Sequence, residues 1–164
     1  MTGPAAAVPH GAGPALRQVQ VGVGVLVWHG GCVLLGRRLG AHGAGTWAAP
    51  GGKLEFGETV LQCAARELLE ETGLVAAQLT PGPTTNDVFG PDGPHFVTLF
   101  VLARGITGTP ANREPHKCAG WAWFPWGDRA AWPAPLFLPA QSLLATGWQP
   151  GDDDKRHTPG TLGA

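Results

Sequence analysis

Residues 52–74 constrain the fold of this chain more than any other stretch, because they combine signals for both ends of a helix with a concentration of carboxylates. Thr59 and Gln62 have the spacing of a capping box, in which two side chains satisfy free backbone N–H groups at a helix start. Gly73 is placed to adopt the left-handed conformation that closes a last turn. We therefore predict a helix over residues 60–72.

Three carboxylates share one face of this predicted helix. Glu67, Glu70 and Glu71 stand at i, i+3 and i+4, and neighbouring carboxylates repel one another unless a cation joins them. Hard oxygen ligands suit Mg²⁺ or Mn²⁺, which in enzymes usually act together with substrate phosphates. The alternative is a solvated acidic face with ordinary ion pairs. The residues expected to face the core are those grouped away from the glutamates, namely Leu61, Ala65, Leu68 and Leu69.

The residues around this helix follow a longer pattern. Gly52, Glu58 and residues 66–74 match G-x5-E-x7-R-E-U-x-E-E-x-G-U, where U is aliphatic, at every specified position. In this pattern the chain resembles the Nudix hydrolases. The resemblance implies an enzyme that cleaves a nucleoside diphosphate linked to another moiety, using a divalent metal bound by this box.

The same resemblance implies roles for single residues of the box. Glu70 and Glu71 correspond to metal ligands, and Glu67 to a ligand or to the base that activates water. Glu58 and Arg66 correspond to supporting residues, because the arginine commonly orients the glutamates by ion pairing.

The resemblance extends beyond the box, over roughly residues 19–148. Within it, residues 21–38, 50–58, 95–98 and 114–126 are similar to the MutT-homologue-two type of nucleotide triphosphate diphosphatase. Members of that type convert nucleoside triphosphates, including deoxynucleotides and thiopurine or oxidised guanine nucleotides, to the monophosphate and diphosphate. The resemblance thus implies a nucleoside triphosphate substrate and a homodimer.

Further site residues follow from this comparison. Arg38 would contact phosphate, the region of Gly51 and Gly52 would flank and bind metal and substrate, Thr98 would approach the sugar or base, and Glu114 would add a carboxylate to the metal site. Phe96 is the aromatic residue favoured for the base, because its neighbour Thr98 is implicated.

One segment departs from the family pattern. Family members carry Gly-Leu where backbone groups meet the purine, whereas this chain has Pro139 and Ala140. Proline removes an amide donor. The chemistry is therefore better supported than the base preference.

Two other functions remain open from the sequence. One is a diphosphatase for ADP-ribose or another nucleotide sugar, and the other is a nucleotide-binding domain without catalysis. Binding-only members tend to lose box glutamates, and every box carboxylate is present here. An enzyme is therefore favoured.

The composition of the chain limits its possible partners and compartment. A net charge of −1 and a pI near 6.6 provide no basic field for a nucleic acid polymer. Three cysteines without Cys-x-x-Cys spacing predict neither a disulfide framework nor a zinc site. No apolar run approaches the length of a membrane span, so we expect no membrane partner and a cytoplasmic location.

We expect one domain over residues 18–148, between flexible tails over residues 1–17 and 149–164. Length and the 43% of hydrophobic residues suit a single core. The tails are rich in small or polar residues, and the run from Asp152 to Asp154 is expected to be solvated.

The rest of the domain is predicted to be mainly β. Residues 19–27 and 32–36 alternate around a glycine turn and predict a hairpin, further strands are expected at 83–89, 95–103 and 120–124, and a second helix is expected at 139–145. The fold class is α/β, an α/β/α sandwich around a mixed sheet, as the resemblance also implies. Residues 121–132, rich in tryptophan, suit either a dimer interface or the core.

Overall fold

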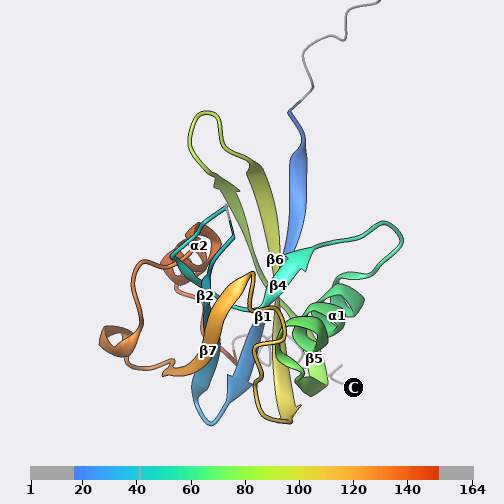
Figure 1. Cartoon of the computed structure of the whole chain (residues 1–164), viewed down its shortest axis with the longest axis vertical. Coiled ribbons are helices and arrows are strands. Elements are labelled where there is room, and N and C mark those ends of the chain that lie inside the picture. Colours follow the sequence, from blue (N-terminus) through green and yellow to red (C-terminus); the bar gives the residue numbers. More distant parts are fainter. Residues whose placement is uncertain (1–16, 41, 152–164) are drawn as a thin grey trace, which may run out of the picture.

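The computed structural model of the chain describes residues 17–40 and 42–151. The predicted tails fall outside this range except for residue 17 and residues 149–151, and the aspartate run at 152–154 lies outside it entirely. Two helices lie on opposite sides of a twisted sheet (Figure 1).

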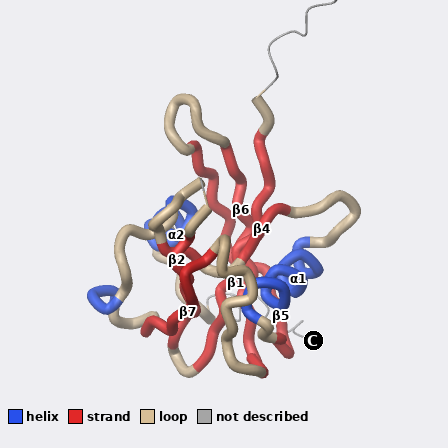
Figure 2. Tube along the Cα trace, viewed as in Figure 1, coloured by secondary structure: helices blue, strands red, loops and turns tan. Residues whose placement is uncertain are grey.

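The sheet is mixed, as predicted. Its seven strands are β1 (Val19–His29), β2 (Cys32–Arg38), β3 (Trp47–Ala48), β4 (Gly51–Lys53), β5 (Val75–Val88), β6 (His95–Thr107) and β7 (Cys118–Pro125). Five of them follow the order β3-β2-β1-β6-β5, while β4 pairs with β1 and β7 pairs with β2. Strands β1 and β6 are parallel, and all other pairs are antiparallel. Figure 2 shows how the strands dominate the described chain.

All five predicted strands are longer than their sequence signals, β1 and β2 by two residues each at their C-terminal ends. The strand predicted at 83–89 begins at residue 75, because β5 continues through its prolines, with an irregular register between Pro81 and Thr84. Strands β6 and β7 also extend beyond the predicted 95–103 and 120–124. Strands β3 and β4 were not predicted, since two or three residues of Trp, Ala, Gly and Lys carry no alternation.

The helices lie where they were predicted. Helix α1 (Val60–Thr72) has both hydrogen bonds of the Thr59–Gln62 capping box and ends at Gly73, whose φ is 74°. Helix α2 (Leu138–Ala145) begins one residue before the prediction, and a short 3₁₀ helix, η1 (Arg129–Ala131), precedes it. None of the helices within the described ranges is long and apolar enough to cross a membrane.

The predicted core face of α1 is wrong except for Leu68. Leu61 and Leu69 are 36% and 45% exposed, and Ala65 is exposed as well. The buried residues are Cys63, Ala64, Leu68 and Thr72. At 100° per residue, Glu71 lies about 20° and Glu67 about 60° from Ala64 on the helical circle, so these two glutamates lie on the side turned toward the sheet. The acidic side of α1 therefore faces the protein, and the stripe of Leu61, Ala65 and Leu69 faces solvent.

Two cores pack against the two faces of the sheet. Alternate residues of β1 (Val23, Val25, Val27) lie in the core that contains Ala64 and Leu68 of α1. Leu26 points the other way, into the core with Phe100, Leu143 and Trp148. Trp126 is 6% exposed in that second core, which supports core packing for part of the tryptophan-rich segment.

Candidate active site

Arg66 organises the carboxylates of α1. Its guanidinium donates to Glu58 at 2.8 and 3.0 Å, to Glu67 at 2.6 Å and to Glu70 at 3.3 Å. The hydrogen bonds from Arg66 to Glu58 lower the pKa of that carboxyl group to about 2. Because one side chain contacts three carboxylates from the loop and the helix, Arg66 fixes their relative positions, as the sequence suggested.

Glu67 and Glu71 lie against strand β4. The backbone N–H of Gly51 donates to Glu71 at 3.0 Å. A Cβ atom at Gly52 would collide with the carboxylate of Glu67, and one at Gly51 would collide with the Val23 carbonyl oxygen. Glycine at position 52 therefore allows the Glu67 carboxylate to approach β4 closely, and glycine at position 51 allows β4 to lie close to the backbone of β1.

A cavity of about 310 Å³, here called the acidic cavity, opens beside these residues. Its charged lining residues are Glu67, Glu71, Glu114, Arg38, Lys53 and Lys117. Lys117 donates to Glu114 at 2.9 Å. Glu70 does not line this cavity, and its side chain is 53% exposed beside Arg66. The cavity thus brings together two of the three helix glutamates and the loop carboxylate.

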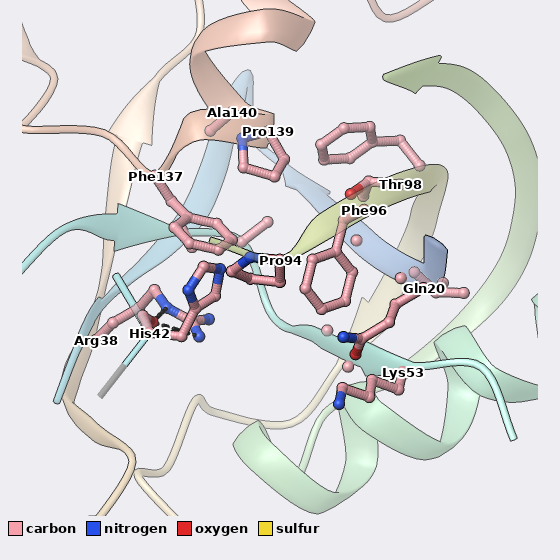
Figure 3. Close-up of a pocket in the computed structure, with 18 residues that line it drawn as sticks. Gln20, Arg38, His42, Lys53, Pro94, Phe96, Thr98, Phe137, Pro139 and Ala140 are labelled. Atoms are coloured by element: carbon pink, nitrogen blue, oxygen red, sulfur yellow. Dashed lines mark hydrogen bonds between the residues drawn. The ribbon is translucent and has the colours of Figure 1, made fainter. Parts of the chain in front are cut away.

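A second cavity of about 340 Å³, the aromatic cavity, shares lining residues with the first. Figure 3 shows the residues that line it. Phe96, Phe137 and His42 surround it, and the His42 and Phe96 rings stack with centroids 5.9 Å apart. Arg38 lies over the Phe137 ring at 4.3 Å. Thr98 contributes a hydroxyl to the lining.

The two cavities share one boundary. Arg38, Lys53 and the backbone of Gly51 and Gly52 line both. A ligand with an aromatic group in one cavity can therefore place anionic groups in the other, next to two cations and the carboxylates.

Burial disfavours the ionised forms of Glu67 and Glu71. Burial raises the pKa of Glu71 to about 7, and the charges of Glu67 and Glu114 act in the same direction against the hydrogen bond from Gly51. Burial also raises the pKa of Glu67, opposed by the hydrogen bond from Arg66. Each carboxylate would ionise more readily if a cation joined it.

This donor set suits a hard divalent cation chemically. Its members are oxygen ligands, and two of them are partly buried next to each other. Within residues 17–40 and 42–151, however, no three His, Cys, Asp or Glu side chains already surround a common point. Arg66 holds Glu67, Gly51 holds Glu71, and Lys117 holds Glu114. Metal binding would therefore require these side chains to reorient.

Most residues selected from the sequence lie at one of the two cavities. Arg38 lines both, whereas its neighbour Arg37 is exposed at the end of β2. Phe96 and Thr98 line the aromatic cavity, and Glu114 lines the acidic one. Glu58 lies behind the site, bound to Arg66.

Sequence reasoning assigned no role to four other lining residues, Gln20, His42, Lys53 and Lys117. The sequence does contain a signal for Gln20, because strand alternation places it on the same face as Gly22 and Gly24. Lys53 follows the paired glycines directly. No pattern indicates His42, which lies in an irregular loop.

Pro139 lines the aromatic cavity, as the departure from the family pattern suggested. It stands in the first turn of α2 and has no amide hydrogen. The N–H of Ala140 donates to the Phe137 carbonyl at 2.9 Å. This wall of the cavity therefore offers no free amide at either position.

We expect the metal-free protein to become more stable when the pH falls from 8 to about 5, as a result of Glu71. Its pKa in the folded state, about 7, exceeds the value of 4.5 in the unfolded chain. The folded state therefore binds the proton more tightly, and the penalty present above pH 7 disappears as Glu71 is protonated. Thermal unfolding in a chelator at several pH values measures this, and Glu71→Gln should reduce the slope. A slope unchanged in that variant would contradict the assignment.

The chain is similar in sequence to several known proteins. A family model described as NUDIX domain matches residues 18–144. An oxidized purine nucleoside triphosphate hydrolase from Danio rerio is 53% identical over 130 residues, covering 73% of this chain and 80% of that protein. An 8-oxo-dGTP diphosphatase from Escherichia coli is 38% identical over 100 residues, covering 60% and 76%. The chain spans 38% of the length of a further relative from Mycobacterium tuberculosis.

A solved structure supports the same assignment. The MutT NUDIX hydrolase from Burkholderia pseudomallei superposes with a TM-score of 0.71 at 31% sequence identity, covering 78% of this chain and 98% of that one. The matched family model covers the whole sheet, both cavities and the capped helix with its glutamates. The chain therefore belongs to the Nudix family of hydrolases.

Proposed function

We propose that this chain is a metal-dependent nucleoside triphosphate diphosphatase, which converts ribo- or deoxynucleoside triphosphates, including oxidised or thiopurine nucleotides, to the monophosphate and diphosphate. The observation that carries the proposal is the shared boundary of the aromatic and acidic cavities at Arg38 and Lys53. A base can occupy the first cavity while the phosphates reach the second. The names of the Danio rerio and Escherichia coli relatives support the same substrate class.

Nudix hydrolases generally use divalent metal ions. We propose Mg²⁺, or Mn²⁺, held by Glu67, Glu70 and Glu71, the carbonyl oxygen of Gly51 and Glu114. Such an ion, when bound, neutralises phosphate charge and lowers the pKa of a water molecule. Glu70 has to turn from Arg66 to take part, since it lies outside the acidic cavity.

The side chains of the site accept the proton and stabilise the phosphate charge. A glutamate of α1, Glu67 or Glu71, accepts the proton of the attacking water. Arg38 offers its cationic side chain to the phosphates, because it lines both cavities. Water forms the new P–O bond, the bond to the outgoing diphosphate breaks, and Lys53 and Lys117 face the charge that develops in the acidic cavity.

Product analysis tests this function. Purified protein with Mg²⁺ would be incubated with canonical, oxidised and thiolated nucleoside triphosphates and with ADP-ribose, and Glu71→Gln would serve as the inactive control. We expect monophosphate and diphosphate from triphosphates, lost in the control. Turnover of ADP-ribose alone would replace the proposal with a nucleotide-sugar diphosphatase, and binding without any product would replace it with a non-catalytic role.

We also propose a homodimer, a cytoplasmic location, and neither a nucleic acid polymer nor a membrane as partner. The family resemblance supports the dimer, and the near-neutral charge supports the absence of polymer binding. Light scattering after size exclusion tests the dimer, and a molar mass of 17.0 kDa would contradict it.

A further inference from the structure

The aromatic cavity has a floor made of alternate residues from two neighbouring strands. Gln20, Gly22 and Gly24 of β1 line it, and Phe96 and Thr98 of β6 line it beside them. The register pairs Gln20 with Phe96 and Gly22 with Thr98. Gly22 has no side chain to fill the space beside Phe96 and Thr98, whereas the ring of Phe100 lies over Gly24. The next strand, β5, lies just beyond the two β6 residues.

Asp87 of β5 lies directly behind this floor. It pairs with Phe96, and Thr85 pairs with Thr98. Directly opposed residues of antiparallel strands point to the same face, with Cβ atoms about 4.5–5.5 Å apart. Asp87 therefore lies on the cavity side of the sheet, one strand beyond the residues that line the cavity.

The carboxylate of Asp87 is buried and held by two hydroxyl groups. Asp87 is 3% exposed. Thr85 donates to its Oδ2 at 2.8 Å, and Ser142 of α2 donates to its Oδ1 at 2.5 Å. No Lys, Arg or His side chain in the described part of the chain forms an ion pair with it. A charge buried without a cation acts on its surroundings over several ångströms.

Charges of opposite sign thus lie on two sides of the aromatic cavity. Arg38 and Lys53 line it where it meets the acidic cavity, and the described lining residues include no Asp or Glu. Asp87 lies toward the opposite edge of the sheet, on β5. A ligand that fits this arrangement has an anionic end near the two cations and an electropositive edge turned toward β5.

We propose that Asp87 determines base specificity, selecting nucleotides whose base presents an exocyclic amino group toward β5 over otherwise similar bases that lack it. The inference rests on the proposed function for the identity of the ligand. The amino group is the positive end of a base edge, so the buried carboxylate stabilises it through Thr98 and Phe96 without direct contact. A carbonyl oxygen at the same place carries a partial negative charge and is repelled by the carboxylate.

Ser142 acts as a positioning residue in this arrangement. Helix α2 supplies Pro139 and Ala140 to the cavity wall, and its N-cap residue Phe137 makes no side-chain capping bond. The hydrogen bond from Ser142 to Asp87 ties the helix to β5 one turn after Pro139. This bond sets the distance between the wall and the floor, whereas the charge of Asp87 sets the preference for the base.

The test compares purine nucleotides that differ at one or two atoms. We would measure kcat/KM for dGTP, dATP and dITP, since dITP lacks the 2-amino group of dGTP and replaces the 6-amino group of dATP by oxygen. The better amino-bearing substrate should exceed dITP by about tenfold in the unmodified protein, the order expected of a buried charge acting on a base edge several ångströms away. Asp87→Asn, which removes the charge while keeping the size, should bring this ratio close to one.

Ser142→Ala distinguishes the effect of the Asp87 charge from the effect of the position of α2, and Asp92→Asn serves as a control. Ser142→Ala should raise KM for all three substrates alike and leave the ratio unchanged, because Thr85 still holds the charged carboxylate. Asp92→Asn is the matched control, because Asp92 lies in the loop between the same two strands with its side chain fully exposed. It should alter neither the ratio nor KM.

Each result decides the proposal. A ratio near one in the unmodified protein, or a ratio kept in Asp87→Asn, would overturn it. Calorimetric binding of dGMP, dAMP and dIMP without metal repeats the comparison without turnover, so absent hydrolysis would defeat the proposed function and leave this test in force. Asp87→Thr, which removes the charge and places a β-branched side chain that suits a strand, replaces Asp87→Asn if that variant fails to fold, and a full preference in it would also count against the charge.

Discussion

Glu67→Gln is expected to lower kcat by roughly 10²–10³-fold or more while the protein stays folded, on the scale of losing one preorganised electrostatic group. Glu67 lines the acidic cavity and accepts a 2.6 Å bond from Arg66. Glutamine keeps an oxygen for that bond but can neither accept the proton of water nor carry the charge that a cation requires. Steady-state hydrolysis with Mg²⁺ measures the loss, and circular dichroism monitors the fold.

Glu55→Gln is the matched control for this change. Glu55 also faces Arg66, but at 3.9 Å and with a side chain that is 70% exposed. Its loss should leave kcat within about twofold, because exposed ion pairs contribute little. Near-normal turnover in Glu67→Gln would remove Glu67 from the mechanism.

Gly52→Ala should reduce activity by about 10²-fold through displacement of a carboxylate. A Cβ atom there would overlap the Glu67 carboxylate, which is the far end of a flexible side chain. The side chain can move aside, so the fold should survive while the geometry of the site does not. Hydrolysis rates and thermal unfolding, measured together, distinguish a displaced carboxylate from a general loss of structure.

Gly127→Ala provides the comparison for this variant. No atom lies within 4 Å of a Cβ built at Gly127, and its φ is not positive. It should retain full activity. If Gly52→Ala were equally active, the close contact between β4 and Glu67 would not matter for catalysis.

Local signals explain the elements that were predicted well. Helix α1 begins and ends where its capping box and Gly73 indicated, because caps act within one turn. The β1–β2 hairpin follows from alternation around two glycines, both of which have positive φ. The family resemblance implied that Arg66 pairs with glutamates of the box, and Arg66 donates to Glu58, Glu67 and Glu70.

The orientation of α1 could not be read from its own residues. A helical projection assumes that polar residues face solvent, whereas Glu67 and Glu71 face strand β4. Leu61 and Leu69 are consequently exposed. Placement of an acidic face toward the protein depends on glycines that come from another element of the fold.

The sequence by itself determined the capped helix, the order of its carboxylates, the hairpin and the family. Only the tertiary structure decided that Glu70 lies outside the acidic cavity, that Arg38 joins two cavities, and that Asp87 lies behind Thr98 and Phe96. The physical reason is the range of the interactions. Caps, turns and i, i+4 spacing act between neighbours in the chain, whereas a cavity or a buried charge arises where strands far apart in sequence lie side by side.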